Sequence, residues 1–586
     1  MRALNHFRCF RFGLLLLILL GLHAITRAQT PDEDKATREN RKGSITGRVV
    51  NQSGQPLANT MVILRSYGQA EGGMAFTDVE GNFKVTGLAP AAYLISVYAA
   101  TYVPVPRDPD VNPIGYYHIG DSARIEMMKG GVITGTVRRA NGEPVVSVAI
   151  RAFMVRDGKG QPSRFADPVS RGQTDDRGVY RLYGLAPGTY VIATEGTYAS
   201  GYGIQPYEGD APTYAPSSTR DTAAEVTVNA GEEAANIDIR YRDDRGHAVS
   251  GRVTAANSVD PSRGFNVTLL SVLNGTEEAS YVFYQSPDLG GFMFTGVADG
   301  EYNVFAAGYS PTNDTSISEV RHIKVSGADI TAIDLAVKPL ASISGAVRLE
   351  DSKAAECQGK LRPVMDEVVV GTYHNEKTAP KELPQSVWDA GRPVTPDKQG
   401  SFLLRNLAAG QYRFVTRPLA KYWYLKSISW PPAAKAAQIN QPLDAAKDWT
   451  TIKTGDKYSG LIITFAAGAA SIEGRIEPRA DQKTWSRLFV YLTPVEAEKR
   501  EDVLRYFVSL AGDDGSFRVS NVPPGRYWIV AKAAAENDTN MLSKLRLPDG
   551  NELRARILRE SETGKTETEL KPCQNVTDYR LALLPR

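Results

Sequence analysis

The stretch TDDRGVYRLYGLAPGTY, residues 174–190, contains two patterns that decide the fold. An acidic turn from Asp175 to Gly178 leads into the aromatic Tyr180, and a closing pattern runs from Gly184 to Tyr190. Asp side chains cap backbone amides in such turns, and Gly supplies the positive φ that they require. The stretch therefore predicts two turns with a β-strand between them and a second strand that begins at the final tyrosine.

Both patterns occur five times, and each pair is preceded by an opening pattern of the form apolar-x-Gly-x-Val/Ile. The opening glycines are Gly47, Gly135, Gly251, Gly345 and Gly474. The closing tyrosines are Tyr93, Tyr190, Tyr302, Tyr412 and Tyr527. Since the opening glycines lie roughly 90 to 130 residues apart, each repeat has the length of one small domain.

The strand signals are alternations of apolar and polar residues, separated by Gly, Pro, Asn and Asp clusters, and helical periodicity is nearly absent. We therefore predict an all-β protein, with five tandem antiparallel β-sandwich domains after a signal peptide. The predicted boundaries are 1–28 for the signal peptide, 29–42 for a linker, and 43–130, 131–243, 244–340, 341–468 and 469–586 for the five sandwiches.

The first 28 residues have the pattern of a secretion signal. Arg2, Arg8 and Arg11 precede an apolar stretch, and Thr26-Arg27-Ala28 fits a cleavage site after Ala28. The uncharged run from Phe12 to Thr26 is shorter than the roughly 20 residues of a membrane-spanning helix. We therefore expect a secreted, periplasmic or cell-envelope protein with no stable membrane span after cleavage.

Charge and cysteine content limit the partners. Cleavage removes four Arg from 68 Lys+Arg and leaves 64 against 66 Asp+Glu, so the mature chain has a net charge of about −2 and no basic surface that favours nucleic acid. Two cysteines remain, Cys357 and Cys573, in an export context where disulfides persist. They lie in different repeats, and whether they form a disulfide stays open because bridging requires close Cα atoms.

Repeats 1 and 2 resemble a known domain family. The run from Gly47 to Pro56, followed by Asp78, Gly81, Phe83 and Tyr93, is similar to the carboxypeptidase regulatory-like domain. That domain is a transthyretin-like (prealbumin-like) sandwich of the carbohydrate-binding-like superfamily, related to Cna B-type repeats. The resemblance implies this fold and an accessory or carbohydrate-binding role. Repeats 3 to 5 keep the opening Gly and closing Tyr but lose the Gly-x-Pro turn.

No catalytic or metal-binding constellation is found in the sequence. None of the four mature histidines has Glu three residues on, as a zinc peptidase would need, and His118 in the sequence His118-Ile119-Gly120-Asp121 comes nearest. The acidic pairs Asp175-Asp176 and Asp513-Asp514 supply too few ligands for calcium and are better explained as turns. We expect neither an enzyme nor a cofactor.

Aromatic residues gather in repeat 4, where a long loop is expected from Ala420 to Lys453. Tyr422, Trp423, Tyr424 and Trp430 are the candidate ligand-binding residues, because flat aromatic faces stack on sugar rings. The alternative is that some of these side chains fill the core of repeat 4.

These observations favour an exported, non-catalytic, multi-domain binding protein that binds carbohydrate through loops at the sandwich ends. The partner would be a polysaccharide or an envelope protein. A cell-envelope scaffold or spacer between proteins is the alternative, and an accessory part of a peptidase or glycan-active system is the third hypothesis. The sequence leaves the ligand, the oligomeric state and the rigidity of the domain string open.

Overall fold

The computed structural model of the chain describes residues 42–68, 70–105, 115–163, 170–195, 207, 209–255, 264–273, 276–285, 290–378, 391–416, 420–430, 444–477, 487–512, 514–534, 541–564 and 566–583. The predicted signal peptide and most of the predicted linker lie outside the described residues. These predictions therefore stay predictions.

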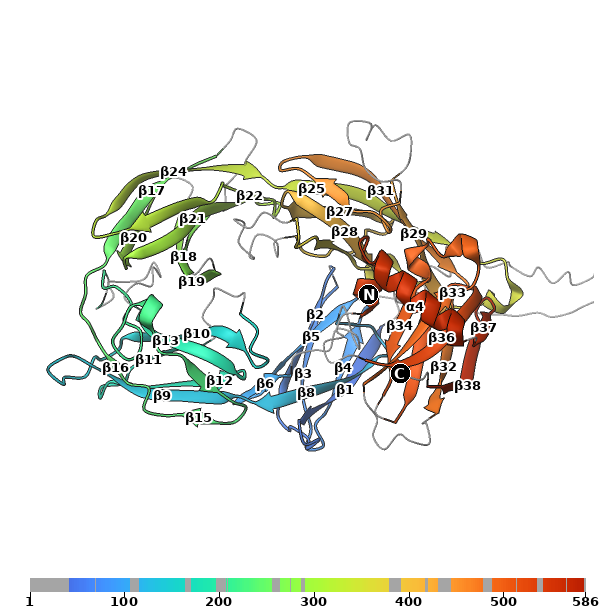
Figure 1. Ribbon diagram of the computed structural model, residues 1–586, viewed down its shortest axis with the longest axis horizontal. Helices are drawn as coiled ribbons and strands as arrows, with labels where there is room; N and C mark the ends of the chain where they lie inside the picture. The colour runs from blue at the N-terminus through green and yellow to red at the C-terminus, as the bar shows by residue number, and fades with distance from the viewer. Residues whose placement is uncertain are drawn as a thin grey trace, which may run out of the picture. The chain divides into compact units, whose positions relative to one another are not determined.

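Repeat 1 shows the architecture most simply. It consists of β1 (Gly43–Asn51), β2 (Met61–Ser66), β3 (Gly73–Phe76), β4 (Asn82–Leu88), β5 (Tyr93–Tyr98), β6 (Tyr102–Pro104), β7 (Tyr116–Tyr117) and β8 (Ser122–Lys129). These strands form two sheets, with the orders β4-β1-β8-β6 and β3-β2-β5-β7 (Figure 1). The prediction of an all-β sandwich is confirmed, and its strand pairs are antiparallel except for the parallel pair of β1 and β8.

The later repeats vary this plan. Repeat 2 contains β9 (Gly131–Arg138), β10 (Ala149–Asp157), β11 (Ser170–Gln173), β12 (Val179–Leu185), β13 (Gly188–Glu195), β14 (Val226–Val228), β15 (Glu233–Ala234) and β16 (Ile239–Arg240). Repeat 3 contains β17 (His247–Ala255), β18 (Phe265–Leu273), β19 (Thr276–Gln285), β20 (Gly291–Val297), β21 (Gly300–Tyr309), β22 (Thr315–Ile317), β23 (Arg321–Val325) and β24 (Ile330–Pro339). In repeat 3, β22 pairs with both β21 and β24, so all eight strands belong to one folded sheet.

Repeat 4 contains β25 (Ala341–Glu350), β26 (Val370–His374), β27 (Ser401–Leu407), β28 (Gly410–Thr416), β29 (Trp423–Ser429), β30 (Thr450–Ile452) and β31 (Lys457–Ala467). Repeat 5 contains β32 (Ala470–Glu477), β33 (Leu488–Pro494), β34 (Phe507–Leu510), β35 (Ser516–Val522), β36 (Gly525–Ala533), α3 (Met541–Leu545), α4 (Asn551–Gly564), β37 (Glu567–Leu570) and β38 (Asn575–Ala582). Each repeat has its own main buried apolar cluster, and that of repeat 4 includes Val503 and Leu504 of repeat 5. Two smaller clusters join repeat 4 to repeat 3 through Ala408 and to repeat 1 through Val369.

The opening glycine permits a close approach between strands. A Cβ on Gly47 would lie 2.4 Å from the carbonyl oxygen of Ala123 in β8 and 2.5 Å from the ring of Phe83, the aromatic that follows the acidic turn. The same kind of clash, with a carbonyl oxygen of the last strand or of the segment leading into it, would occur at Gly135, Gly251, Gly345 and Gly474. The opening pattern therefore requires glycine because the backbone of the C-terminal end of each repeat fills the space of a side chain.

The closing tyrosine forms a hydrogen bond that recurs in all five repeats. Its hydroxyl donates to the carbonyl oxygen four residues earlier, at 2.8 Å from Tyr93 to Ala89 and at 2.9 Å from Tyr527 to Pro523. Tyr190, Tyr302 and Tyr412 make the equivalent bond to Ala186, Ala298 and Ala408. The first residue of this turn has positive φ, which explains why it is glycine in repeats 1 to 3 and Asn406 or Asn521 in repeats 4 and 5.

The first and last strands of every repeat are parallel neighbours. β1 pairs with β8, β17 with β24, β25 with β31 and β32 with β38, and in repeat 2 β9 pairs with β15 and β16. Because two parallel strands run in the same direction, the chain enters one end of each sandwich and leaves at the opposite end. The next repeat begins at once in three cases, since β9, β25 and β32 start within three residues of the end of the preceding strand.

Two sequence expectations differ from the structure. The segment from Ala420 to Lys453, expected as a loop, contains β29 and β30, and repeat 5 contains the helices α3 and α4, which the nearly absent helical periodicity did not predict. No helix within the described ranges is both long enough and apolar enough to cross a membrane.

Candidate functional site

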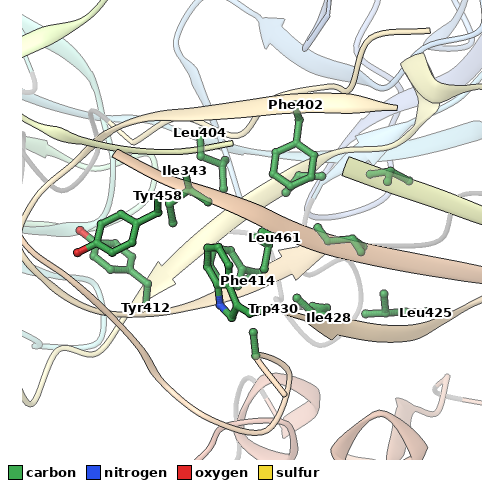
Figure 2. Close-up of a cluster of buried hydrophobic side chains, with 14 of the residues drawn as sticks. Ile343, Phe402, Leu404, Tyr412, Phe414, Leu425, Ile428, Trp430, Tyr458 and Leu461 are labelled. Atoms are coloured by element: carbon green, nitrogen blue, oxygen red, sulfur yellow. The ribbon is translucent and has the colours of Figure 1, made fainter. Parts of the chain in front are cut away.

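Trp423 and Trp430 belong to the core of repeat 4. Each side chain is only 3% exposed. The Trp423 indole N–H donates to the carbonyl oxygen of Leu361 at 3.1 Å, and the Trp430 ring lies edge-on to Phe414 with 6.3 Å between centroids. Figure 2 shows Trp430 among Phe414, Ile428 and Leu461. The prediction that these two tryptophans bind ligand is wrong, because a sugar ring cannot stack on a face that the core covers.

Tyr422 and Tyr424 lie on either side of Trp423 and remain partly exposed. The Tyr422 hydroxyl accepts a hydrogen bond from the Asn575 amide at 2.9 Å, and Lys360 Nζ lies 4.8 Å from its ring centroid. Although burial acts in the opposite direction, this hydrogen bond together with Lys421 and Lys360 lowers the pKa of Tyr422. Burial raises the pKa of Tyr424. Tyr422 thus also contacts repeat 5, and ligand binding by Tyr422 and Tyr424 stays a prediction.

The candidate segment lies at a junction between repeats 4 and 5. Cys357 and Cys573 are joined across this junction by a disulfide, with Cα atoms 5.4 Å apart. The Asn521 amide donates to the carbonyl oxygens of Ala420 at 3.0 Å and Trp423 at 2.7 Å. Together with the insertion of Val503 and Leu504 into the core of repeat 4, these contacts make the aromatic segment part of an inter-repeat seam.

Two ion pairs add to the seam. Lys447 Nζ lies 2.7 Å from Glu501 Oε2, and Lys377 Nζ lies 2.7 Å from Asp549 Oδ2. All four side chains are substantially exposed, so each pair adds little stability. The covalent bond, the shared core and the Asn521 hydrogen bonds are the main contacts that hold the two repeats together.

A recess beside Tyr422 is too small to bind a ligand of the usual size. Its empty volume is about 190 Å³, below the range of roughly 300–1,000 Å³ that is typical of small-molecule sites. It is lined by Lys421, Tyr422, Ala469, Ala470, Ser471, Ser520, Asn521 and Asn575.

The acidic turns are structural. Asp175 Oδ1 accepts hydrogen bonds from the backbone amides of Val179 at 2.8 Å and Arg177 at 2.9 Å, and these bonds, with the Arg177 guanidinium, lower the pKa of Asp175. The carboxylate of Asp121 lies 3.6 Å from the ring of His118, whose side chain is 15% exposed. Across the described ranges, no group of three or more His, Cys, Asp or Glu side chains could hold a metal ion.

The seam was not predicted from the sequence, although one signal for it exists. Asn replaces Gly at the first position of the closing turn only in repeats 4 and 5. In both, the side chain contacts the preceding repeat: the Asn406 amide donates to the carbonyl oxygen of Asn313 at 3.1 Å, and its own oxygen accepts from the Thr315 amide at 2.7 Å. A residue that tolerates positive φ and also carries hydrogen-bonding groups thus marks both junctions.

Comparison with known proteins identifies the first repeat. Residues 44–115 match the family model of the carboxypeptidase regulatory-like domain. Repeat 1 is therefore similar to this domain family. This confirms the resemblance where its motifs are most complete. No curated protein matches the chain.

Three solved structures show how distant the likeness is. The Bacillus anthracis TIE protein is 15% identical, with 51% of each chain covered and a TM-score of 0.14, so the match spans about half of that protein's chain. Two B repeat units of the collagen binding protein of Staphylococcus aureus are 13% identical over 73% of this chain and 100% of theirs, with a TM-score of 0.13. The major pilin subunit of Bacillus cereus is 10% identical over 50% of this chain and 99% of its own, with a TM-score of 0.13. At these values the likeness carries no information on function.

Proposed function

We propose that the protein is an exported, non-catalytic scaffold of tandem sandwich domains, bounded as the repeats predict, that holds partners in the cell envelope against mechanical load. The observation that carries the proposal is the parallel pairing of the first and last strands in every repeat. Tension on the two ends of a repeat pulls these strands in opposite directions along their length. All hydrogen bonds of the parallel ladder then share the load instead of breaking one by one.

This proposal replaces carbohydrate binding as the leading hypothesis. The aromatic site on which carbohydrate binding was based is buried at Trp423 and Trp430, and the recess beside Tyr422 is smaller than a typical ligand site. None of the contacts described above favours the third hypothesis, an accessory part of a peptidase or glycan-active system.

Single-molecule force spectroscopy of residues 29–586 tests the proposal. We expect repeats 1 to 3 to unfold in separate events. The unfolding force of each event should be clearly higher than the force needed to separate two strands that are pulled apart from one end. A matched control pulls repeat 1 through cysteines introduced at Asn82 and Arg48, which face each other in the antiparallel pair of β4 and β1. If the end-to-end geometry unfolds at the same low force as this control, the load-bearing function is wrong.

A further inference from the structure

The outer face of one sheet in repeat 1 is apolar. On β2, β3 and β5, alternate residues point away from the buried cluster. The outward residues include Met74, Phe76 and Tyr98, which are 59%, 56% and 51% exposed. Strand pairing places Met61 between Phe76 and Tyr98, and Ile63 beside Met74. These five residues, Met61, Ile63, Met74, Phe76 and Tyr98, form one continuous surface, called here the repeat 1 face.

Four of the five corresponding positions in repeat 2 are polar. Tyr98 and Glu195 correspond, because each lies five residues after the closing tyrosine of its repeat. Tyr98 pairs with Met61 and Glu195 pairs with Ala149, so Ala149 corresponds to Met61. By the same register, Arg151, Arg171 and Gln173 correspond to Ile63, Met74 and Phe76. Repeat 2 carries Ala, Arg, Arg, Gln and Glu at these five positions, with Arg151 buried, so this fold does not require apolar residues there.

Repeat 5 shows what covers an apolar face of this kind. Its residues at the positions of Met61, Ile63, Met74 and Phe76 are Phe489, Tyr491, Val508 and Leu510. There the helices α3 and α4 pack on the sheet, and Met541, Leu545 and Ile557 bury Phe489 and Tyr491. In repeat 1 the described residues include no helix, and three side chains of the face stay more than half exposed.

We propose that the repeat 1 face is a docking surface for a short amphipathic helix of a partner protein. The inference goes beyond the scaffold function, because it concerns what repeat 1 binds and not how the repeats carry load. It is based on the comparison of repeats 1 and 5. Both carry apolar residues at the same strand positions, but helices cover these residues only in repeat 5.

The size of the face favours a helix over a second copy of the chain. Three strands spaced about 4.8 Å apart, with outward residues two positions apart on each strand, give a face of roughly 10 by 7 Å. This fits one side of an α-helix, which is about 10 Å wide with its side chains. It is far less than the roughly 800 Å² that each partner contributes to a stable interface of standard size.

Charge and an existing contact define the helix further. Arg65, also on the outward side of β2, is exposed, and no ion pair with it is found among the described residues. An acidic residue beside the apolar stripe of the helix would pair with it. The face also continues into Leu94, which joins a small cluster with Tyr116 and with Val369 of repeat 4, so one edge of the surface already serves as an interface.

A defined helical probe tests the proposal. A fluorescent peptide of residues 541–564, the segment that covers the equivalent face in repeat 5, is titrated into the purified chain 29–586 and followed by anisotropy. We expect saturable binding of one peptide per chain. The variant Met74→Arg, Phe76→Gln, Tyr98→Glu should weaken binding more than tenfold, because it carries the repeat 2 residues at those positions. Unchanged thermal unfolding of this variant shows that it folds.

Two controls isolate the face and the helix. Tyr183→Ala removes a 63% exposed tyrosine from repeat 2 and should leave binding unchanged. A peptide with Ile557→Pro, which breaks the helix at the buried apolar residue of α4, should not bind.

Three outcomes would overturn the proposal. The first is absence of peptide binding, or equal binding by wild type and the triple variant. The second is a wild-type chain that sediments as a dimer while the triple variant is a monomer, which would assign the face to a second copy. The third is binding only to a chain that starts at Lys42, which would show that the chain's own N-terminal segment occupies the face.

Discussion

At the scale of single residues, the fold of each repeat depends on a few positions that accept few residue types. The closing tyrosine is almost fully buried in every repeat, yet its hydroxyl reaches a carbonyl oxygen four residues earlier. Burial raises the pKa of Tyr93, and it raises that of Tyr527 to about 12, so both hydroxyls stay protonated and donate at physiological pH. The turn and the strand that follows are therefore fixed to each other by one bond.

Tyr93→Phe should destabilise repeat 1 by about 1–3 kcal/mol, because the carbonyl oxygen of Ala89 loses its buried partner while the ring stays in place. Hydrogen exchange of β4 and β5 measured by mass spectrometry would report the change. Tyr183→Phe, at an exposed site, is the control. Equal protection in both variants would show that the hydroxyl contributes nothing.

The acidic turn of repeat 2 should make stability depend on pH. The pKa of Asp175 is lower in the folded chain than in the unfolded one, so its contribution is present above the ordinary Asp value of about 3.9 and is lost as pH falls through the folded value. Asp175→Ala should therefore lower protection of residues 174–190 at pH 7, and the difference from wild type should shrink towards pH 2. A difference that stays constant with pH would contradict this.

At the scale of elements, the strands could be predicted because the repeated patterns encode them directly. The candidate site could not, for a reason visible in β29. Trp423 and Leu425 point to one face, but the pairing with β31 shifts between Leu425 and Ser427, and this irregularity brings Ile428 and Trp430 to the same buried side. If strict alternation of buried and exposed residues is assumed, the apolar pattern ends at this irregularity. The sequence then suggests that the two tryptophans lie in an exposed loop.

The helices of repeat 5 were missed for a related reason. In α4 only Arg554, Ile557 and Ser561 are buried, and two of these three are polar. The guanidinium of Arg554 donates hydrogen bonds to the carbonyl oxygens of Leu545, at the end of α3, and of Leu547, just after it. These contacts compensate the burial of the charge, and the apolar periodicity of the sequence does not reveal them. Tertiary packing on β33 and β36, and not a strong apolar stripe, holds this helix in place.

The seam between repeats 4 and 5 should loosen in Asn521→Gly. Glycine keeps the positive φ, as it does in repeats 1 to 3, but removes the hydrogen bonds to Ala420 and Trp423. With the disulfide reduced, amides of β29 and β35 should exchange faster than in reduced wild type, while β1 to β8 stay unchanged. Equal exchange in both reduced proteins would show that the side chain adds nothing to the junction.

At the scale of the whole molecule, the disulfide decides which part of the chain carries tension. It links positions 216 residues apart, so a pull on the termini passes through the bond and bypasses most of repeats 4 and 5. We expect force–extension curves to gain roughly 75 nm of contour length when reductant is added, the extended length of that segment. Curves of equal final length with and without reductant would contradict this path, and Cys357→Ser with Cys573→Ser should reproduce the reduced result.

The same bond also governs what happens when the backbone is cut. A protease that cleaves one peptide bond anywhere between Cys357 and Cys573 produces two fragments that stay joined through sulfur. The nicked protein would run as an intact chain on a gel without reductant and as two pieces with it. In an extracellular setting rich in proteases, whatever is attached at one terminus would therefore remain tethered to the other after such a cut.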